Sequence, residues 1–226
     1  MIVSAAICPH PPLLLPGLTG AADVGAALRS MCESAVQEAL EAAPDRVVVV
    51  GGADTTATWE PTTPVDPSPY GGPDVGDPAS GPRLPLSLMV GRTLLDWPAD
   101  VVLQGVATDA SPEDCAALGA AIVADERTTL LVLGDGSARR NIKAPGYVDD
   151  RAVGFDEQVT GALSRADAGA LSALDPKLAS ELLVAGRAAW QVLAGALGGR
   201  PAAGRLLHAD DPFGVLYLVA TWRCAG

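Results

Sequence analysis

The sequence predicts an α/β fold with a mixed, mostly parallel central sheet and helices on both of its faces. Short, continuously apolar runs rich in valine and isoleucine are typical of strands that are covered on both sides. Longer segments with apolar residues at helical spacing alternate with these runs over most of the length. Hydrophobic residues make up 49% of the 226 residues, which is ample for a buried core. We expect one domain over residues 1–226, since no repeat or hinge is visible.

The first predicted elements are a strand, a helix and a second strand. The run Ile2 to Ile7 is uninterrupted and is closed by Pro9, which predicts a buried strand. Apolar residues at helical spacing from Asp23 to Ala42 predict the helix that follows. Val47 to Val50 are consecutive β-branched residues, and the two glycines after them predict that this central strand ends there.

Residues 60–85 predict one long loop. They contain eight prolines and four glycines, which are too many for regular structure. A loop of this length in a compact domain is either disordered or folded over a site as a cover, and the sequence leaves both alternatives open. Trp59 and Tyr70, beside and within the loop, either face an aromatic ligand or pack against the sheet.

The remaining elements continue the alternation. Ser111 is the expected N-cap of a helix, because Pro112 follows it and acidic residues occupy the first turn. Asp175 is expected to cap a single helix from Lys177 to Leu197. The other expected elements are helices over residues 86–97 and 152–163, strands over 101–107 and 128–134, and a C-terminal hairpin of strands 204–209 and 213–222 joined through residues 210–212.

The charge balance narrows the class of partner. A net charge of −12 with a pI near 4.4 opposes binding to a phosphate backbone or to an anionic membrane surface. We expect a small molecule or a protein as partner, no nucleic acid and no membrane, and we leave a homodimer open. No apolar run approaches the roughly 20 residues of a membrane span, and no signal peptide is visible. The four cysteines are widely spaced, so we expect a soluble, cytoplasmic protein with free thiols.

Candidate functional residues follow three of the predicted strands. In open α/β sheets, ligands gather beyond the carboxyl ends of the strands, so we predict that the side chains found there converge. These residues are His10, Asp54, Asp135 and Ser137. The prolines around His10 fix its backbone either for binding or for a structural turn, and the other three residues carry the same two alternatives. Arg139 is predicted to hold a carboxylate or phosphate, or else to be solvated.

The order of several motifs resembles a known family. Over nearly its whole length the chain contains, in order, ICPHPPLLLPG, PDRVVVVGGAD, LVLGDGSARR with APGYVDDRAVGFDEQV, LDPKLASELLVAGRAAWQVLAGALGG and DDPFGVLYLVA. Together they resemble the class III extradiol ring-cleavage dioxygenases, and among these the proteins that are similar to the β-chain of protocatechuate 4,5-dioxygenase. The resemblance implies the α/β fold of that family and a non-haem Fe(II) enzyme that opens catechol-type rings with O₂. Such an enzyme holds its metal through two histidines and a carboxylate, and it uses a further acid–base histidine.

Only one of these four functional positions keeps its residue here. His10 of PHPP corresponds to the first metal ligand. The second ligand aligns with Ala53, the acid–base histidine with Ala138, and the carboxylate ligand with Val184. The chain has one further histidine, His208, so a site with three histidines cannot be assembled within a single chain. The resemblance therefore implies the family fold with a degenerate metal site.

Three hypotheses about function follow. The leading one is a diverged homologue that lacks the ring-cleaving iron centre, needs no cofactor, and binds a small molecule or a protein. Its expected ligand-binding residues are Asp54, Asp135, Ser137 and Arg139. The second is a metal-dependent dioxygenase or hydrolase with a centre rebuilt around His10, Asp54 and Asp135, which would suit Fe(II) or another divalent metal. The third is a non-catalytic partner chain of a hetero-oligomer, so the sequence leaves open whether the protein is an enzyme.

Overall fold

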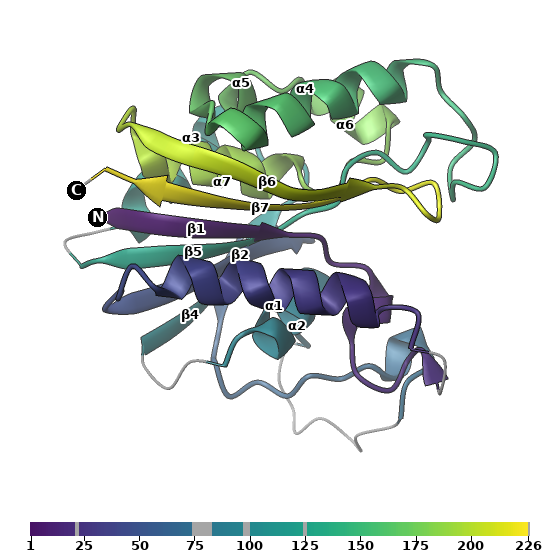
Figure 1. Ribbon diagram of the computed structural model, residues 1–226, viewed down its shortest axis with the longest axis horizontal. Helices are drawn as coiled ribbons and strands as arrows, with labels where there is room; N and C mark the ends of the chain where they lie inside the picture. The colour runs from purple at the N-terminus through teal and green to yellow at the C-terminus, as the bar shows by residue number, and fades with distance from the viewer. Residues whose placement is uncertain (21–22, 74–82, 97–99, 124–125, 226) are drawn as a thin grey trace.

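The computed structural model describes residues 1–20, 23–73, 83–96, 100–123 and 126–225, and it confirms the predicted α/β fold class (Figure 1). These residues form a seven-stranded sheet in the order β3-β4-β2-β5-β1-β7-β6. Its strands are β1 (Ile2–Cys8), β2 (Arg46–Ala53), β3 (Ala57–Trp59), β4 (Asp100–Ala107), β5 (Thr128–Leu133), β6 (Ala202–Asp210) and β7 (Tyr217–Cys224). The helices are α1 (Ala26–Leu40), α2 (Leu86–Leu94), α3 (Pro112–Ile122), α4 (Arg151–Arg165), α5 (Ala168–Ser172), α6 (Pro176–Glu181) and α7 (Arg187–Leu197).

The middle of the sheet is parallel and its flanks are antiparallel. Strands β4, β2, β5 and β1 run in the same direction, whereas β3 pairs antiparallel with β4, β7 with β1, and β6 with β7. Because β2, β5 and β1 are parallel neighbours, the loops that follow them all start at one edge of the sheet, as the sequence predicts. We call this edge the carboxyl edge.

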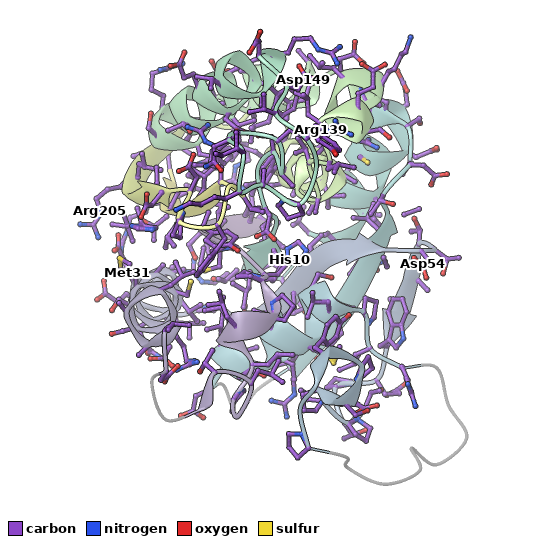
Figure 2. All side chains as sticks on the ribbon, turned by 90° about the vertical axis from the view of Figure 1, so that its right-hand side faces the viewer. His10, Met31, Asp54, Arg139, Asp149 and Arg205 are labelled. Atoms are coloured by element: carbon purple, nitrogen blue, oxygen red, sulfur yellow. The ribbon has the colours of Figure 1, made fainter. Side chains whose placement is uncertain are left out.

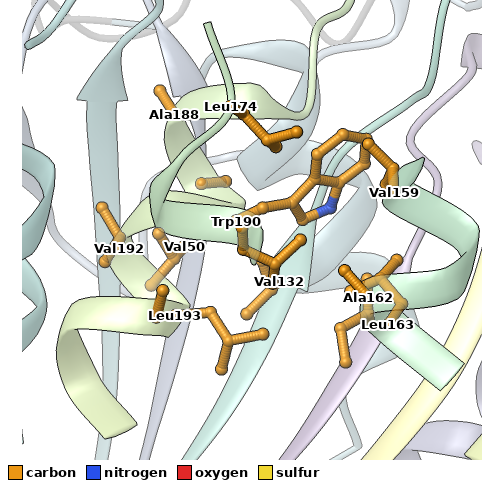
Figure 3. Packing of buried hydrophobic residues seen from close by; sticks show 14 of the residues in the cluster. Val50, Val132, Val159, Ala162, Leu163, Leu174, Ala188, Trp190, Val192 and Leu193 are labelled. Atoms are coloured by element: carbon orange, nitrogen blue, oxygen red, sulfur yellow. The ribbon is translucent and has the colours of Figure 1, made fainter. Parts of the chain in front are cut away.

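Helices cover both faces of the sheet (Figure 1). Helices α1 and α2 pack on one face, where Val47 and Val49 of β2 point, and α3 to α7 cover the other, where Val48 and Val50 point. All four valines are therefore buried, as expected for a central strand. The larger cluster surrounds Trp190 of α7, which is fully buried among side chains such as Val132 and Val159 (Figure 3).

The expectation of one helix from Lys177 to Leu197 is wrong. The chain forms α6, breaks, and resumes as α7. At the break, Leu183 adopts a left-handed conformation with φ 57°, and its N–H and that of Val184 donate back to carbonyl groups of α6. This back-bonding satisfies the last carbonyls of the helix and ends it without a glycine. The break turns the chain so that Gly186 lies against the ring of Trp190.

The predicted C-terminal hairpin is confirmed, but its turn is longer than expected. Strand β7 begins at Tyr217 rather than at Phe213. The physical reason is that the backbone of Leu216 forms its hydrogen bonds with Gly136 and Ser137 in the loop after β5.

Other differences are local. The short elements β3 and α5 were not predicted, and the helix expected over residues 86–97 ends at Leu94, with Trp97 outside the described residues. Of the predicted loop, residues 60–73 and 83–85 are described and include a short 3-10 turn over Ser68–Tyr70, while residues 74–82 lie outside the described ranges.

The two ends of the chain lie close together, far from the carboxyl edge. Strand β1 starts and the antiparallel strand β7 finishes at the opposite edge of the sheet, with Ser4 paired to Arg223. Figure 1 shows the N and C labels next to each other there. Among the described helices, none is long and apolar enough to cross a membrane.

Candidate functional site at the carboxyl edge

The chain leaves β1 and β5 towards opposite faces of the sheet. After β1 it runs to α1 on one face, and after β5 it runs to α4 on the other. Such a divergence between neighbouring parallel strands is where open α/β proteins commonly bind their ligands. His10 follows β1 and Asp135 follows β5, so the fold brings both residues to this point.

His10 and Asp135 form the closest pair among the predicted site residues. The backbone N–H of His10 donates to Oδ1 of Asp135 at 2.8 Å, and Nδ1 of His10 lies 3.9 Å from the same oxygen. Prolines have no N–H, so His10 supplies the one amide donor of the sequence Pro9-His10-Pro11-Pro12. The two side chains are 10% and 13% exposed, and Nδ1 has no hydrogen-bond partner among the described residues. The turn thus directs an amide donor at Asp135, while no described residue pairs with Nδ1.

The electrostatics of this pair are governed by burial. Burial raises the pKa of Asp135, and the neighbouring His10 with its amide donor offsets part of that increase. Burial and, to a smaller extent, the charge of Asp135 raise the pKa of Tyr217 to about 12. Tyr217 is the first residue of β7, so the edge combines a carboxylate kept from water with a phenol that stays protonated at neutral pH.

Ser137 is engaged inside the protein. Its Oγ donates to Oδ2 of Asp156 at 2.6 Å and its N–H donates to Oδ1 at 2.9 Å, and both residues are buried. Arg140 donates to the same carboxylate at 2.8 Å and also pairs with Asp211. One buried carboxylate therefore accepts three hydrogen bonds and ties the loop after β5 to α4 and, through Arg140, to the β6–β7 turn.

Asp54 is not brought next to His10. It is exposed, and Figure 2 shows it at the side of the molecule, apart from His10. Burial first, and then the charge of Asp54, raise the pKa of Tyr70, so residues 60–73 fold back near the end of β2. Trp59 packs across β4, since a Cβ on Gly105 would come within 2.5 Å of its ring. For Trp59, packing against the sheet is the alternative that the structure adopts.

Arg139 lies above His10 in Figure 2, next to Asp149. The N–H of Asp149 donates to the carbonyl of Arg139 at 3.0 Å. The pKa of Asp149 is lowered to about 2, mainly by hydrogen bonds from Arg151, with a smaller effect from the charge of Arg139. Arg139 packs against Gly146, and its Nε is buried without a hydrogen-bond partner among the described residues.

Residues 182–186, at the break between α6 and α7, complete the edge. The N–H of Ala138 donates to the carbonyl of Leu182 at 3.1 Å, and the N–H of Gly186 donates to the carbonyl of Asp135 at 2.9 Å. This segment is therefore fastened to the loop after β5 at both of its ends.

The same segment also approaches β2. A Cβ on Gly52 would lie 3.3 Å from the carbonyl oxygen of Ala185. Gly52 is the neighbour of Ala53, and Ala185 is the neighbour of Val184. The segments that carry His10, Ala53 and Val184 thus meet at one edge, although sequence alone places them far apart.

A pocket of about 540 Å³ adjoins this segment. It is lined by residues after β4, by residues of α6, and by Leu183, Val184, Ala185 and Arg187, and it contains none of the predicted site residues. Its wall includes Arg187, which is 3% exposed and donates to the carbonyl of Thr108 at 2.6 Å and to Gln191 at 3.0 Å. The volume lies in the range of small-molecule sites, which is roughly 300–1,000 Å³.

The donors at the edge do not fit the triad that the resemblance implies. His10 and Asp135 supply one imidazole and one carboxylate. His208 lies in β6, opposite Val219 and two strands away from β1. In the part of the chain that the structure describes, no three His, Cys, Asp or Glu side chains are grouped so that they could hold a metal ion.

Sequence reasoning missed three residues of this edge. Asp156, Tyr217 and Arg187 are all buried and polar or aromatic. Asp156 had a detectable signal, because it occupies the apolar face of a predicted helix, between Phe155 and Val159. A carboxylate at such a position needs a buried partner. Tyr217 and Arg187 had no comparable signal.

The fold and the site together define an α/β protein with a candidate ligand site at the carboxyl edge of its sheet. No family model matches the sequence, and no curated protein matches it. Among solved structures, the chain is similar to the uncharacterized protein JW3007 from Escherichia coli K12, with a TM-score of 0.52 and 15% sequence identity. The match covers 98% of this chain and 99% of that one. At this identity the likeness concerns the fold alone.

Proposed function

We propose that this protein binds a small organic molecule at the carboxyl edge, as a relative of the class III extradiol dioxygenases that lacks the ring-cleaving iron centre. The observation that carries the proposal is the composition of that edge. Segments bearing the motif positions of His10, Ala53, Ala138 and Val184 meet there, yet they contribute one imidazole only. The pocket of about 540 Å³ beside them supplies the space for a ligand.

Ring cleavage is tested with the purified chain loaded with Fe(II) under anaerobic conditions. Protocatechuate and O₂ are then added, and oxygen uptake and the ring-opened product are measured. We expect neither above the rate of free Fe(II), because one imidazole and one carboxylate give a weak site for the metal. Catalytic turnover that disappears in His10→Ala would refute the loss of the iron centre.

Binding is tested separately by ligand-observed NMR with a library of small aromatic and carboxylate fragments. Ala185→Trp places a large side chain at the pocket wall. Val24→Trp serves as the control, since Val24 is 65% exposed and precedes α1, which packs on the other face of the sheet. Fragment binding should be detected with the wild type and with the control but not with the Ala185→Trp variant. Equal fragment binding to all three proteins, or binding to none of them, would refute a ligand site at this pocket.

One observation favours a second candidate, a metal-dependent enzyme with a rebuilt centre. Nδ1 of His10 is buried without a hydrogen-bond partner among the residues that the structure describes, and it lies 3.9 Å from Oδ1 of Asp135. Its test is the metal content per chain after incubation with Fe(II), Mn(II) or Zn(II) and desalting. Near-stoichiometric metal in the wild type and its loss in His10→Ala would favour this candidate over the first.

A further inference from the structure

Arg187, the first residue of α7, carries a buried positive charge without an anionic partner. It is 3% exposed, and it forms no ion pair with any described residue. Buried charges in proteins are normally paired with an opposite charge, because the loss of hydration is costly. The guanidinium of Arg187 therefore lacks the compensation that a buried cation usually has.

Some donors of Arg187 are used inside the protein. Nη1 donates to the carbonyl of Ala110 and to Oε1 of Gln191, and it lies 4.0 Å from Sγ of Cys115. Nη2 donates to the carbonyl of Thr108. These bonds fasten α7 to the turn between β4 and α3 and give Arg187 a structural role.

Other donors of the same guanidinium have no such partner. Nε carries one N–H and Nη2 carries a second, and neither of these donates to a residue in the described ranges. Nε and Nη2 together form an edge of the guanidinium that can hold a carboxylate through two parallel hydrogen bonds. The structural role of Arg187 thus leaves donors of this edge available.

Arg187 lies in the wall of the pocket of about 540 Å³. Gly186, the N-cap of α7, has no side chain to cap the helix, so the positive end of the helix dipole meets the pocket beside Arg187. Much of the remaining wall is apolar and consists of Pro176, Ala179, Leu183, Val184 and Ala185. An apolar pocket with a few fixed polar groups is typical of a site for a small organic molecule.

Two further charged residues line the pocket, and both are exposed. Lys177 is 87% exposed and lies 4.0 Å from Glu181, which also pairs with Arg151. Asp109 is exposed and forms no ion pair with a described residue. The wall therefore carries two basic side chains and one acidic one, and its buried part carries the charge of Arg187.

Acidic residues also occur close to the wall in the sequence. Glu113, Asp114 and Asp175 are exposed and do not line the pocket. Asp175 caps α6, and Asp114 pairs with the hydroxyl of Ser111. Water and salt screen the charges of exposed side chains, whereas a charge kept from water acts strongly over a short distance. The acidic surroundings therefore weaken an anion site at the guanidinium edge of Arg187 only modestly.

We propose that the ligand of this pocket is a small organic acid whose carboxylate binds Nε and Nη2 of Arg187. The apolar body of the acid would lie against α6 and residues 183–185. The inference rests on the ligand binding proposed above and narrows it to one chemical class. Asp109 in the exposed part of the wall repels a second carboxylate, so a monocarboxylate fits better than a dicarboxylate.

The test compares benzoate, phenylacetate and hexanoate with the corresponding amides on the wild-type chain. Dissociation constants and the Nε–H signal of Arg187 are measured by proton–nitrogen correlation NMR. Each acid should bind about tenfold or more tightly than its amide, because the amide cannot accept two charge-assisted hydrogen bonds from the guanidinium. Each acid should also shift the Nε–H signal of Arg187 further than its amide does.

Three variants separate binding from folding. Asp109→Asn alters an exposed residue and removes a negative charge from the wall, so it should tighten the binding of the acids by about twofold and leave the amides unchanged. Glu33→Gln removes an exposed carboxylate of α1, on the other face of the sheet, and should change neither. Arg187→Gln should abolish the preference for acids, and its melting temperature reports the loss of the structural bonds separately. The measurements on the wild type and on Asp109→Asn do not require Arg187→Gln to fold.

The inference is overturned if the acids bind no more tightly than their amides, or if the Nε–H signal of Arg187 does not move. It is also overturned if Asp109→Asn affects acids and amides alike. Neutral fragments that bind the wild type but not Ala185→Trp would then leave the proposed ligand site intact and remove only its preference for acids. If no fragment of either kind binds, both proposals fail.

Discussion

Asp135 is a residue whose burial destabilises the folded protein. Its carboxylate is nearly buried and receives one amide hydrogen bond, from His10. A buried carboxylate normally needs several donors or a cation to compensate for lost hydration. The compensation here is partial, since burial still raises the pKa of Asp135. At pH values above the ordinary pKa of an aspartate, Asp135 therefore lowers the stability of the folded state.

Asp135→Asn should consequently be more stable than the wild type at pH 8. The raised pKa means that the unfolded chain releases the Asp135 proton first, near its ordinary value of about 3.9. The loss of stability caused by Asp135 therefore begins as the pH rises above that value. It reaches its full size above the pKa that Asp135 has in the folded protein. Asparagine keeps an oxygen that can accept the His10 N–H. The urea midpoints of the wild type and of Asp135→Asn should differ at pH 8 and coincide near pH 3.

The matched control for this experiment is Asp54→Asn, which removes an exposed carboxylate and should change the urea midpoint little at either pH. If Asp135→Asn were instead less stable at pH 8, the charge of Asp135 would be net stabilising, and the pair with His10 would be a strong ionic interaction.

At the scale of elements, helix ends with a recognisable capping residue could be predicted from the sequence, whereas a helix end without one could not. Ser111 and Asp175 were expected as caps, and their side chains accept hydrogen bonds from Asp114 and from Lys177 and Leu178. The break at Leu183 has no glycine or asparagine at the left-handed position, so its sequence still resembles a continuous helix. The order β2-β5-β1 explains why the pairing of His10 with Asp135 could be expected.

Other parts of the site depend on contacts that no short pattern encodes. Asp156 joins a loop to a helix, and the pocket beside Arg187 arises only after the α6–α7 break forms. Asp54 was expected at the site because β2 ends at the same edge, but its side chain is exposed and lies apart from His10. Strand order alone therefore predicts which edge a residue reaches, and packing decides where it points.

The contact between α3 and α7 gives a prediction about glycine. A Cβ on Gly119 of α3 would lie 2.1 Å from the carbonyl oxygen of Val192 and 2.6 Å from the N of Ala196. Backbone atoms cannot move aside cheaply, so Gly119→Ala should separate the helices and destabilise the protein by roughly 2–3 kcal/mol or more. Chemical denaturation measures the loss.

Gly154 in α4 is the internal comparison for this substitution. A Cβ there would meet nothing within 4 Å, and the residue is exposed within a helix. Gly154→Ala should therefore stabilise the protein by about 0.5–1 kcal/mol through helix propensity. Similar effects of the two substitutions would show that the close approach of α3 to α7 is not required for folding.

At the scale of the whole molecule, the excess of acidic residues acts on stability. A net charge of −12 makes the compact state repel itself. Added salt shortens the Debye length from about 30 Å at ~0.01 M to about 3 Å at ~1 M. We expect the melting temperature at pH 7 to rise over this range of sodium chloride, and to rise much less near the pI of about 4.4. An equal rise in melting temperature at both pH values would mean that the salt does not act by screening the negative charges.

The closeness of the two chain ends has a practical and an evolutionary consequence. Because β1 begins and β7 finishes at the edge opposite to His10, a fusion partner or surface anchor attached at either end leaves the carboxyl edge unobstructed. A short linker could join the ends, so a circularly permuted chain opened in the loop at residues 60–73 can keep β1, β5 and β7 adjacent. Other domains can thus be added at either end of the chain without disturbing the carboxyl edge of the sheet.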